Sequence, residues 1–250
     1  HLYYQGLRQE AIALDHVGSN QYTPQLIAFI EHQNHTYLIR EWIEGPSLQA
    51  MLERQSSWGA AAAIHISIQL LEALTVLHRH GVMHGSLCPQ SVIQHHRSKL
   101  WKLINFKQST LFSISPGISL AGCQPLMQDD LRAVGHLIQT MAARLKIPHQ
   151  SAEHQTNISI LQEAANGLIQ QQPPYQQAQT ALAQMRSQCS TAMLDGTDEF
   201  HVGFIPEALP PSPSGINRFS NLEISDEDHP NRHRAITTGM ATGLLTATAL

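Results

Sequence analysis

The stretch His84-Gly85-Ser86-Leu87-Cys88-Pro89-Gln90-Ser91 is the part of the sequence that decides the fold. It follows the clearest helical pattern in the chain, which runs from Ala60 to His80 with apolar residues at three- and four-residue spacing. Gly81 is expected to end that helix. Two short strand-like segments come afterwards, around Val92-Ile93 and from Trp101 to Phe106. The stretch is therefore expected to lie between a buried helix and a small pair of strands.

Helical and strand patterns also occupy most of the chain on either side of this stretch. Residues 7–17 have the apolar spacing of a helix, and Gly18-Ser19-Asn20 is expected to end it. Two apolar, β-prone runs follow, at 25–31 and 36–43, and the polar turn between them predicts an antiparallel hairpin. Further helices are expected at 47–54, with Ser47 as the capping residue, and at 129–144, 158–171 and 175–188.

The composition is that of a globular domain with few charges. The chain has 250 residues, enough for one large domain and a tail, and charged residues make up only 14% of it, well below the usual quarter or so. A net charge of −4 gives no support for nucleic acid as a partner. Three scattered cysteines form no disulfide framework, which favours a reducing compartment.

The two ends of the chain differ from its middle. The chain opens without Met, directly in a helical pattern, and is therefore interpreted as a fragment of a larger domain. Residues 189–234 lack periodicity and are rich in proline, which predicts a flexible linker. Residues 235–250 carry no charge and follow two arginines; at this length they fall short of the roughly 20 residues that span a bilayer. They are either the start of a transmembrane helix or a weakly apolar tail.

Several motifs occur in a fixed order along the chain. They are Arg8-Gln9-Glu10-Ala11, EWIEGPSL at 41–48, LHRHGVMH at 77–84, Leu103-Ile104-Asn105-Phe106-Lys107, Asp130-Leu131-Arg132-Ala133-Val134-Gly135, and YQQAQTAL at 175–182. In this order they resemble the eukaryotic-like Ser/Thr protein kinase family over roughly residues 7–188. The resemblance implies an α+β fold, with a partial small lobe at 1–45 (one helix, αC, and two strands) and a mainly helical large lobe at 46–188.

The resemblance also assigns positions around a nucleotide site. Glu10 matches the glutamate of the αC helix that pairs with the lysine of strand β3 in kinases, and that lysine would lie before residue 1. Glu41 and Ile43 match the hinge between the lobes, and Ile93 matches a residue of the nucleotide site. Arg40 falls at the gatekeeper position, where a bulky charge would crowd an adenine pocket or need a partner.

The groups that perform the kinase reaction are replaced. In the pattern H-R-D-L-x-x-x-N, the Asp that acts as base is Ser86 here, and the Asn that holds magnesium is Ser91. His84 is kept, whereas Cys88 stands where Ser/Thr kinases usually carry a lysine. The magnesium-binding Asp of D-F-G is Asn105. No catalytic set is therefore intact.

Two further departures affect the loops around these positions. Gly85 replaces the arginine that would pair with a phosphorylated activation loop, and Lys107 replaces the glycine of D-F-G. The segment from Lys107 to Asp130 is short and shows no A-P-E motif, so a platform for a peptide substrate is not expected.

What the sequence keeps is structural. The resemblance implies that Leu14, Phe29, His84 and Phe106 form an apolar column linking the lobes. It also implies that Asp130 supports the base of this column by binding the backbone of the catalytic loop. A folded scaffold needs these residues whether or not it is a catalyst.

These observations predict a pseudokinase, a kinase-like domain that regulates or binds a protein partner such as an active kinase. The alternative is an active, atypical Ser/Thr kinase. No metal site is expected, because the histidines, including His78, His80 and His95-His96, lack a zinc-ligand pattern. No cofactor is expected, although ATP binding with or without magnesium stays open. The domain is expected in the cytoplasm, with residues 235–250 as a candidate attachment to the inner face of a membrane.

Overall fold

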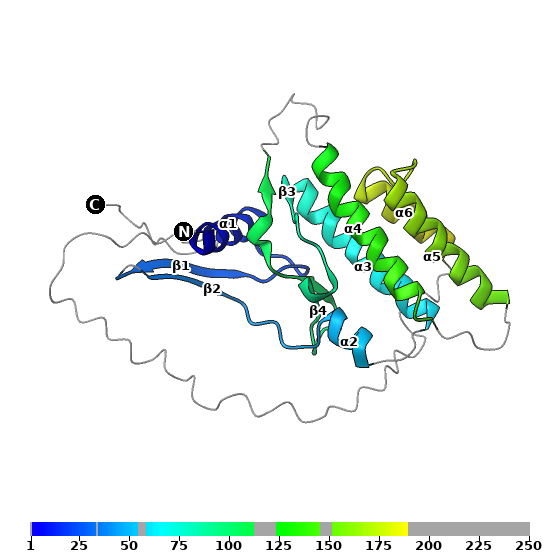
Figure 1. Cartoon of the computed structure of the whole chain (residues 1–250), viewed down its shortest axis with the longest axis horizontal. Coiled ribbons are helices and arrows are strands. Elements are labelled where there is room, and N and C mark those ends of the chain that lie inside the picture. Colours follow the sequence, from blue (N-terminus) through cyan, green and yellow to red (C-terminus); the bar gives the residue numbers. More distant parts are fainter. Residues whose placement is uncertain (1, 34, 55–58, 113–123, 146–151, 190–250) are drawn as a thin grey trace.

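The computed structural model describes residues 2–33, 35–54, 59–112, 124–145 and 152–189. The predicted linker at 189–234, apart from its first residue, and the uncharged segment 235–250 lie outside these described residues. A helix and a hairpin form one side of the molecule, and a group of long helices forms the other (Figure 1). Short strands and loops join the two sides.

The first side consists of helix α1 (Leu2–Val17) and an antiparallel hairpin of β1 (Leu26–His32) and β2 (His35–Arg40). Phe29 pairs across the hairpin with Leu38, and both side chains pack into the core with α1. The pairing shifts register between Leu26 and Ala28, as at a β-bulge. The predicted hairpin is confirmed, and α1 starts earlier than residue 7.

The link between the two sides makes a tight turn before helix α2 (Leu48–Arg54). Ser47 Oγ accepts a hydrogen bond from the Ala50 N–H at 3.1 Å, which confirms the predicted cap. A Cβ at Gly45, whose φ is +154°, would lie 1.8 Å from the Gln94 carbonyl oxygen. Only glycine lets the chain pass so close to the neighbouring strand.

The second side consists of α3 (Ala60–Arg79), α4 (Gln124–Ala142), α5 (Ala152–Gln170) and α6 (Ala178–Gln188). In Figure 1 these helices run beside one another, and α3 lies within the group. By length and composition α3 could cross a membrane, but most of it is buried among the other elements, as in the core helix of a globular domain. Gly81, with φ of +69°, follows its end as predicted.

The described residues between α3 and α4 include four short strands. The pair β3 (Val82–Met83) and β6 (Thr110–Leu111) is antiparallel, and so is the pair β4 (Val92–Gln94) and β5 (Trp101–Leu103). Two single-turn 3-10 helices, η1 (Pro89–Ser91) and η2 (Phe106–Gln108), complete this region. Together they hold the predicted loop against the start of the large helices.

Four predicted boundaries are corrected. Helix α4 begins at Gln124 rather than residue 129, with Pro125 in its first turn, where a helix tolerates proline. Helix α5 begins at Ala152 rather than residue 158, because its first turn is mainly polar and carries no apolar stripe. Helix α6 begins at Ala178 rather than Tyr175, since the Tyr175 N–H closes a turn onto the Gln172 carbonyl. Strand β2 ends at Arg40 rather than Ile43, where the chain leaves the hairpin.

Replacing Gly167 with alanine tests the packing between α5 and the turn before α6. A Cβ there would lie 2.1 Å from Cδ2 of the buried Tyr175 ring. We expect Gly167→Ala to lower the free energy of unfolding by about 1–3 kcal/mol in urea titrations, because the ring must move. Gly6→Ala is the matched control: its Cβ would meet the Lys107 side chain at an ordinary 3.4 Å. The control should raise stability by about 0.5–1 kcal/mol. Equal effects of the two changes would contradict the packing.

Candidate functional site

The carboxylate of Asp130 on α4 holds the loop that begins at His84. It accepts hydrogen bonds from the backbone N–H groups of His84 at 2.8 Å and Gly85 at 2.9 Å. His78 Nε2 on α3 lies 3.1 Å from the same carboxylate. Asp130 is almost fully buried, so these contacts satisfy a charge that water cannot reach. The predicted support of the loop by Asp130 is confirmed.

The His84 side chain extends this support to the next segment. Its Nε2 lies 3.0 Å from the Ile104 carbonyl oxygen, and its ring packs on Phe106 at a centroid distance of 4.7 Å. Burial lowers the pKa of His84, although Asp130 and the Ile104 carbonyl oppose this shift. The imidazole is therefore neutral near pH 7, with its proton on Nε2, and Nδ1 is left to face the Ser86 N–H at 3.4 Å.

The four residues of the predicted column are all buried. Leu14 on α1, Phe29 on β1 and Phe106 on η2 belong to one apolar cluster, and His84 lies against Phe106. The column thus connects the helix and hairpin of the first side with the loop of the second. Its assembly holds the first side against the loop that carries the replaced catalytic positions.

The replaced positions lie close together around this loop. Ser86 Oγ donates to the Asn105 carbonyl oxygen at 3.4 Å. Ser91 is buried, and its hydroxyl accepts from the Cys88 N–H at 3.0 Å and donates to the Cys88 carbonyl at 2.9 Å. The Ser91 hydroxyl is therefore engaged within its own turn, and Cys88 is a half-buried free thiol.

The backbone of the loop explains why Gly85 carries no side chain. Its φ is +72°, and an added Cβ would lie 2.4 Å from the Gln108 carbonyl oxygen. An arginine at this position would need both strain and a shift of η2. Asn105 is also left-handed, with φ of +70°, a conformation that Asn adopts more readily than most residues. Both departures are compatible with the local backbone.

Glu10 on α1 is buried and has a cationic partner. Arg40 Nε lies 3.2 Å from Glu10 Oε1, and the exposed fractions of the two side chains are 28% and 3%. Burial raises the pKa of Glu10, and the attraction of Arg40 and Lys107 only partly opposes this. Of the two expectations for a bulky charge at the gatekeeper position, crowding of an adenine pocket or the need for a partner, Arg40 has a partner in Glu10.

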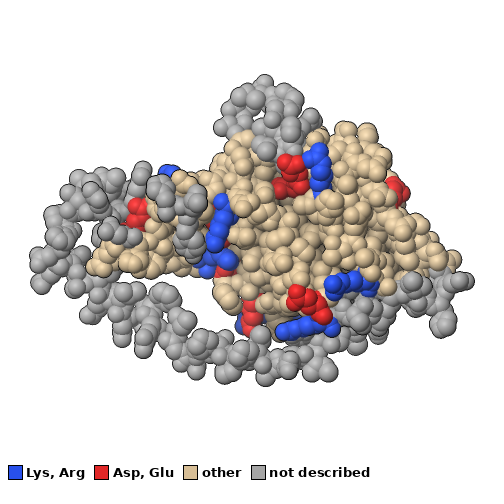
Figure 2. Space-filling model, viewed as in Figure 1, with Lys and Arg blue, Asp and Glu red and all other residues tan. Residues whose placement is uncertain are grey.

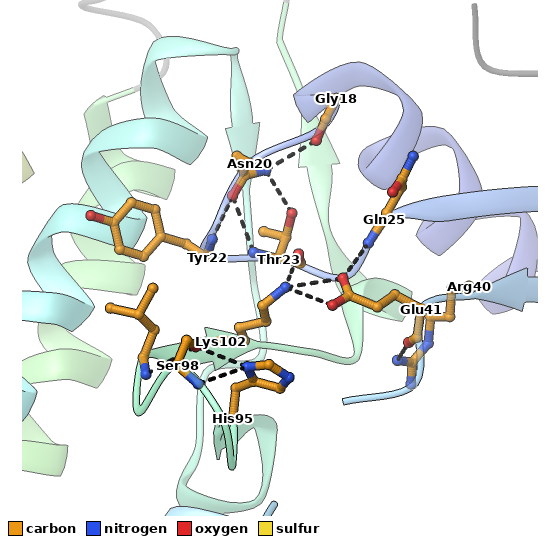
Figure 3. Close-up of polar contacts among 11 residues, drawn as sticks. Gly18, Asn20, Tyr22, Thr23, Gln25, Arg40, Glu41, His95, Ser98 and Lys102 are labelled. Atoms are coloured by element: carbon orange, nitrogen blue, oxygen red, sulfur yellow. Dashed lines mark hydrogen bonds and ion pairs between the residues drawn. The ribbon is translucent and has the colours of Figure 1, made fainter. Parts of the chain in front are cut away.

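Glu41 is bound by a second cation of the chain. Lys102 Nζ on β5 lies 2.9 and 3.0 Å from the two carboxylate oxygens, and 3.4 Å from the Thr23 carbonyl (Figure 3). Glu41 also accepts from the Gln25 N–H at 3.1 Å. Ile43 is buried, while Ile93 is half-buried and forms an isolated bridge with Ser47. Among the predicted nucleotide-site residues, both carboxylates are thus paired within the chain.

Comparison with known proteins supports the resemblance to protein kinases. Residues 3–125 match the model of the protein kinase domain. Over these residues, the chain is similar to Ser/Thr protein kinases. The expected α+β architecture, a partial small lobe followed by a mainly helical large lobe, is confirmed.

Several curated protein kinases are similar to part of this chain. The Ser/Thr-protein kinase PknA of Nostoc sp. is 32% identical over 100 residues, which are 40% of this chain and 18% of that protein. Ser/Thr-protein kinase B of Synechocystis sp. is 24% identical over 98 residues, 39% of this chain and 17% of that protein. The calcium-dependent protein kinase 8 of Oryza sativa subsp. japonica is 28% identical over 108 residues, 42% and 20% of the two chains. The chain matches about a fifth or less of the length of these relatives.

The arrangement of this kinase-like site limits its chemistry. A serine hydroxyl at position 86 is a poor proton acceptor near neutral pH. Mg²⁺ prefers charged oxygen ligands, whereas Ser91 and Asn105 are neutral. Within the described residues, no group of three His, Cys, Asp or Glu side chains is placed to hold a metal ion.

Lys102 is the functional-site residue that sequence reasoning missed. It stands between Trp101 and Leu103 in a short strand whose three residues are all buried. A lysine in such an environment needs an anionic partner. A lysine within a buried strand was therefore the sequence feature that could have indicated an ion pair here. Its partner, Glu41, lies 61 residues away in the sequence, so no local pattern could identify it.

Replacing Asp130 with asparagine tests the support of the loop. The amide loses the charge and one acceptor, which leaves a buried N–H of His84 or Gly85 poorly satisfied. We expect Asp130→Asn to lower the free energy of unfolding by about 2–3 kcal/mol in urea titrations. Asp129→Asn is the matched control, because Asp129 is exposed and pairs with Arg132 at the surface. It should change stability by less than about 1 kcal/mol. Similar losses in both variants would contradict the assignment.

Replacing Glu10 with glutamine tests the raised pKa of that carboxyl. Its pKa in the folded protein lies above the ordinary value of 4.5, so the folded state holds a proton that the unfolded chain releases. Ionisation of Glu10 therefore opposes folding as pH rises above about 4.5. We expect the stability of Glu10→Gln, relative to the unchanged protein, to increase between pH 4.5 and 7. A stability difference that is constant or falls over this range would contradict the shift.

Proposed function

We propose that this kinase-like domain binds a protein partner and does not transfer phosphate. The observation that supports this most strongly is the loop from His84 to Ser91. Its structural contacts through Asp130 and His84 are complete, while the positions of the base and the magnesium ligands hold Ser86, Ser91 and Asn105. The domain keeps the contacts that hold a kinase catalytic loop and lacks the base and the magnesium ligands of phosphate transfer.

The losses concern one catalytic unit. Phosphoryl transfer depends on positioning and on charge stabilisation by metal ions, with little covalent chemistry from the protein. Groups that act as a unit contribute non-additively, so the loss of one already removes most of the rate. Here the base and both magnesium ligands differ together, and the Ser91 hydroxyl is engaged with Cys88.

The second candidate is an active kinase that uses other residues. It is favoured by the buried column of Leu14, Phe29, His84 and Phe106, and by relatives that are named Ser/Thr kinases. An active enzyme would need a base and metal ligands from residues other than Ser86, Ser91 and Asn105. Magnesium dependence therefore separates the two candidates.

Calorimetry with ATP, with and without MgCl2, tests the proposal on the natural protein that contains this chain. We expect no binding that depends on magnesium, because no carboxylate stands at either metal position. A phosphate-transfer assay should give no signal, and Ser86→Ala should leave this result unchanged. Magnesium-dependent binding together with transfer would contradict the proposal and establish the second candidate. Binding without magnesium and without transfer would restrict the proposal to a nucleotide-responsive module.

A further inference from the structure

We propose that Arg40 keeps helix α1 docked by binding Glu10, and that this docking needs no nucleotide. If the domain binds a protein partner as proposed above, that partner would bind a domain in which α1 is always docked. This consequence rests on the proposed non-catalytic function. In the family pattern, a lysine that would lie before residue 1 binds the glutamate at this position. Here a residue of the hairpin takes its carboxylate.

The Glu10–Arg40 pair joins α1 to the end of the hairpin. Glu10 lies in the middle of α1, and Arg40 is the last residue of β2, where the chain turns toward the second side. The Arg40 guanidinium also contacts the Glu41 carbonyl, through Nη1 at 3.4 Å. Of the two acidic residues of α1, Glu10 is buried and Asp15 is exposed. The contact therefore links the one buried carboxylate of α1 to Arg40, where the chain passes from the first side to the second.

Other contacts hold α1 near its first half and toward η2. Tyr4 Oη donates to Glu31 Oε1 on β1 at 2.8 Å, at an exposed position. Gln9 Nε2 donates to the Ser109 carbonyl at 2.8 Å. Both are bonds of neutral donors, whereas the Arg40 contact compensates a buried charge. Loss of Arg40 should therefore affect the docking of α1 more than loss of either neutral donor.

The energetics favour a role in positioning rather than in overall stability. Burial raises the pKa of Glu10 in spite of Arg40 and Lys107, so the pair does not recover the whole loss of hydration. Removing only the cation leaves a buried carboxylate with less compensation. The direct way to hydrate it is movement of α1 away from the hairpin. We expect this movement to be a local opening on the hairpin side, because the apolar face of α1, including Ala11 and Leu14, stays anchored in the core.

Hydrogen exchange measured by mass spectrometry on the full chain tests the proposal. We expect Arg40→Met to speed amide exchange in α1 by about tenfold or more, while α3 keeps its rate. The double variant Glu10→Gln/Arg40→Met should recover much of the protection, because no buried charge remains. Arg132→Met is the matched control, since Arg132 forms an exposed pair with Asp129 and should leave α1 unchanged. Unchanged exchange in α1 of Arg40→Met would overturn the proposal.

Arg40→Gln is the second variant, for the case in which Arg40→Met does not fold. It keeps an amide donor toward Glu10 without the charge, and should give intermediate exchange in α1 with α3 unchanged. Equal acceleration in α1 and α3 would overturn the proposal, because the effect would then be global.

A further measurement, hydrogen exchange in the presence of nucleotide, distinguishes failure of this proposal from failure of the proposed function. Adding ATP and MgCl2 to the unchanged protein should not alter exchange in α1. Extra protection of α1 by the nucleotide would overturn the independence proposed here. Phosphate transfer by a protein whose α1 still depends on Arg40 would overturn the proposed function and leave the docking role standing.

Discussion

The rest of the structure depends on the buried carboxylate of Asp130, which accepts hydrogen bonds from the backbone of the loop that begins at His84. Asp130 binds the N–H groups of His84 and Gly85, and it also contacts His78 on α3. The loop fixed in this way presents the His84 ring to Ile104 and Phe106. Because Phe106 belongs to the same buried cluster as α1 and β1, the position of the first side follows from this contact in the second.

The residues that support this loop are not the residues at the catalytic positions of the family pattern. Asp130 and His84 are buried and bind backbone groups, so their contacts are independent of any reacting molecule. The hydroxyls of Ser86 and Ser91 make their hydrogen bonds elsewhere, to the Asn105 carbonyl and to Cys88. Gly85 shows that the backbone is adapted to the change, because η2 occupies the space that a side chain would need. A kinase frame without its chemistry is therefore physically consistent.

Much of the frame could be predicted from the sequence, because it depends on periodicity and on local capping. The long apolar stripe of α3, the hairpin and the Ser47 cap are local features. The polar first turn of α5 and the buried Tyr175 beside Gly167 were not recognised, since neither produces a periodic signal. The pairing of Lys102 with Glu41 was also missed, because the chemistry of a buried lysine requires an anion but does not say which one.

The two ion pairs point to one physical property of the region that the family pattern assigns to a nucleotide. A buried or half-buried carboxylate needs a nearby positive charge, and that charge can come from a ligand, a metal or the chain. Glu10 receives it from Arg40, and Glu41 receives it from Lys102. Both pairs join segments that are distant in sequence. The Arg40–Glu10 pair joins the end of β2 to α1, and the Glu41–Lys102 pair joins the residue after β2 to β5 (Figure 3). Charged side chains are otherwise scattered in small patches over the described face (Figure 2). Each of these two carboxylates therefore has a cationic partner within the chain itself.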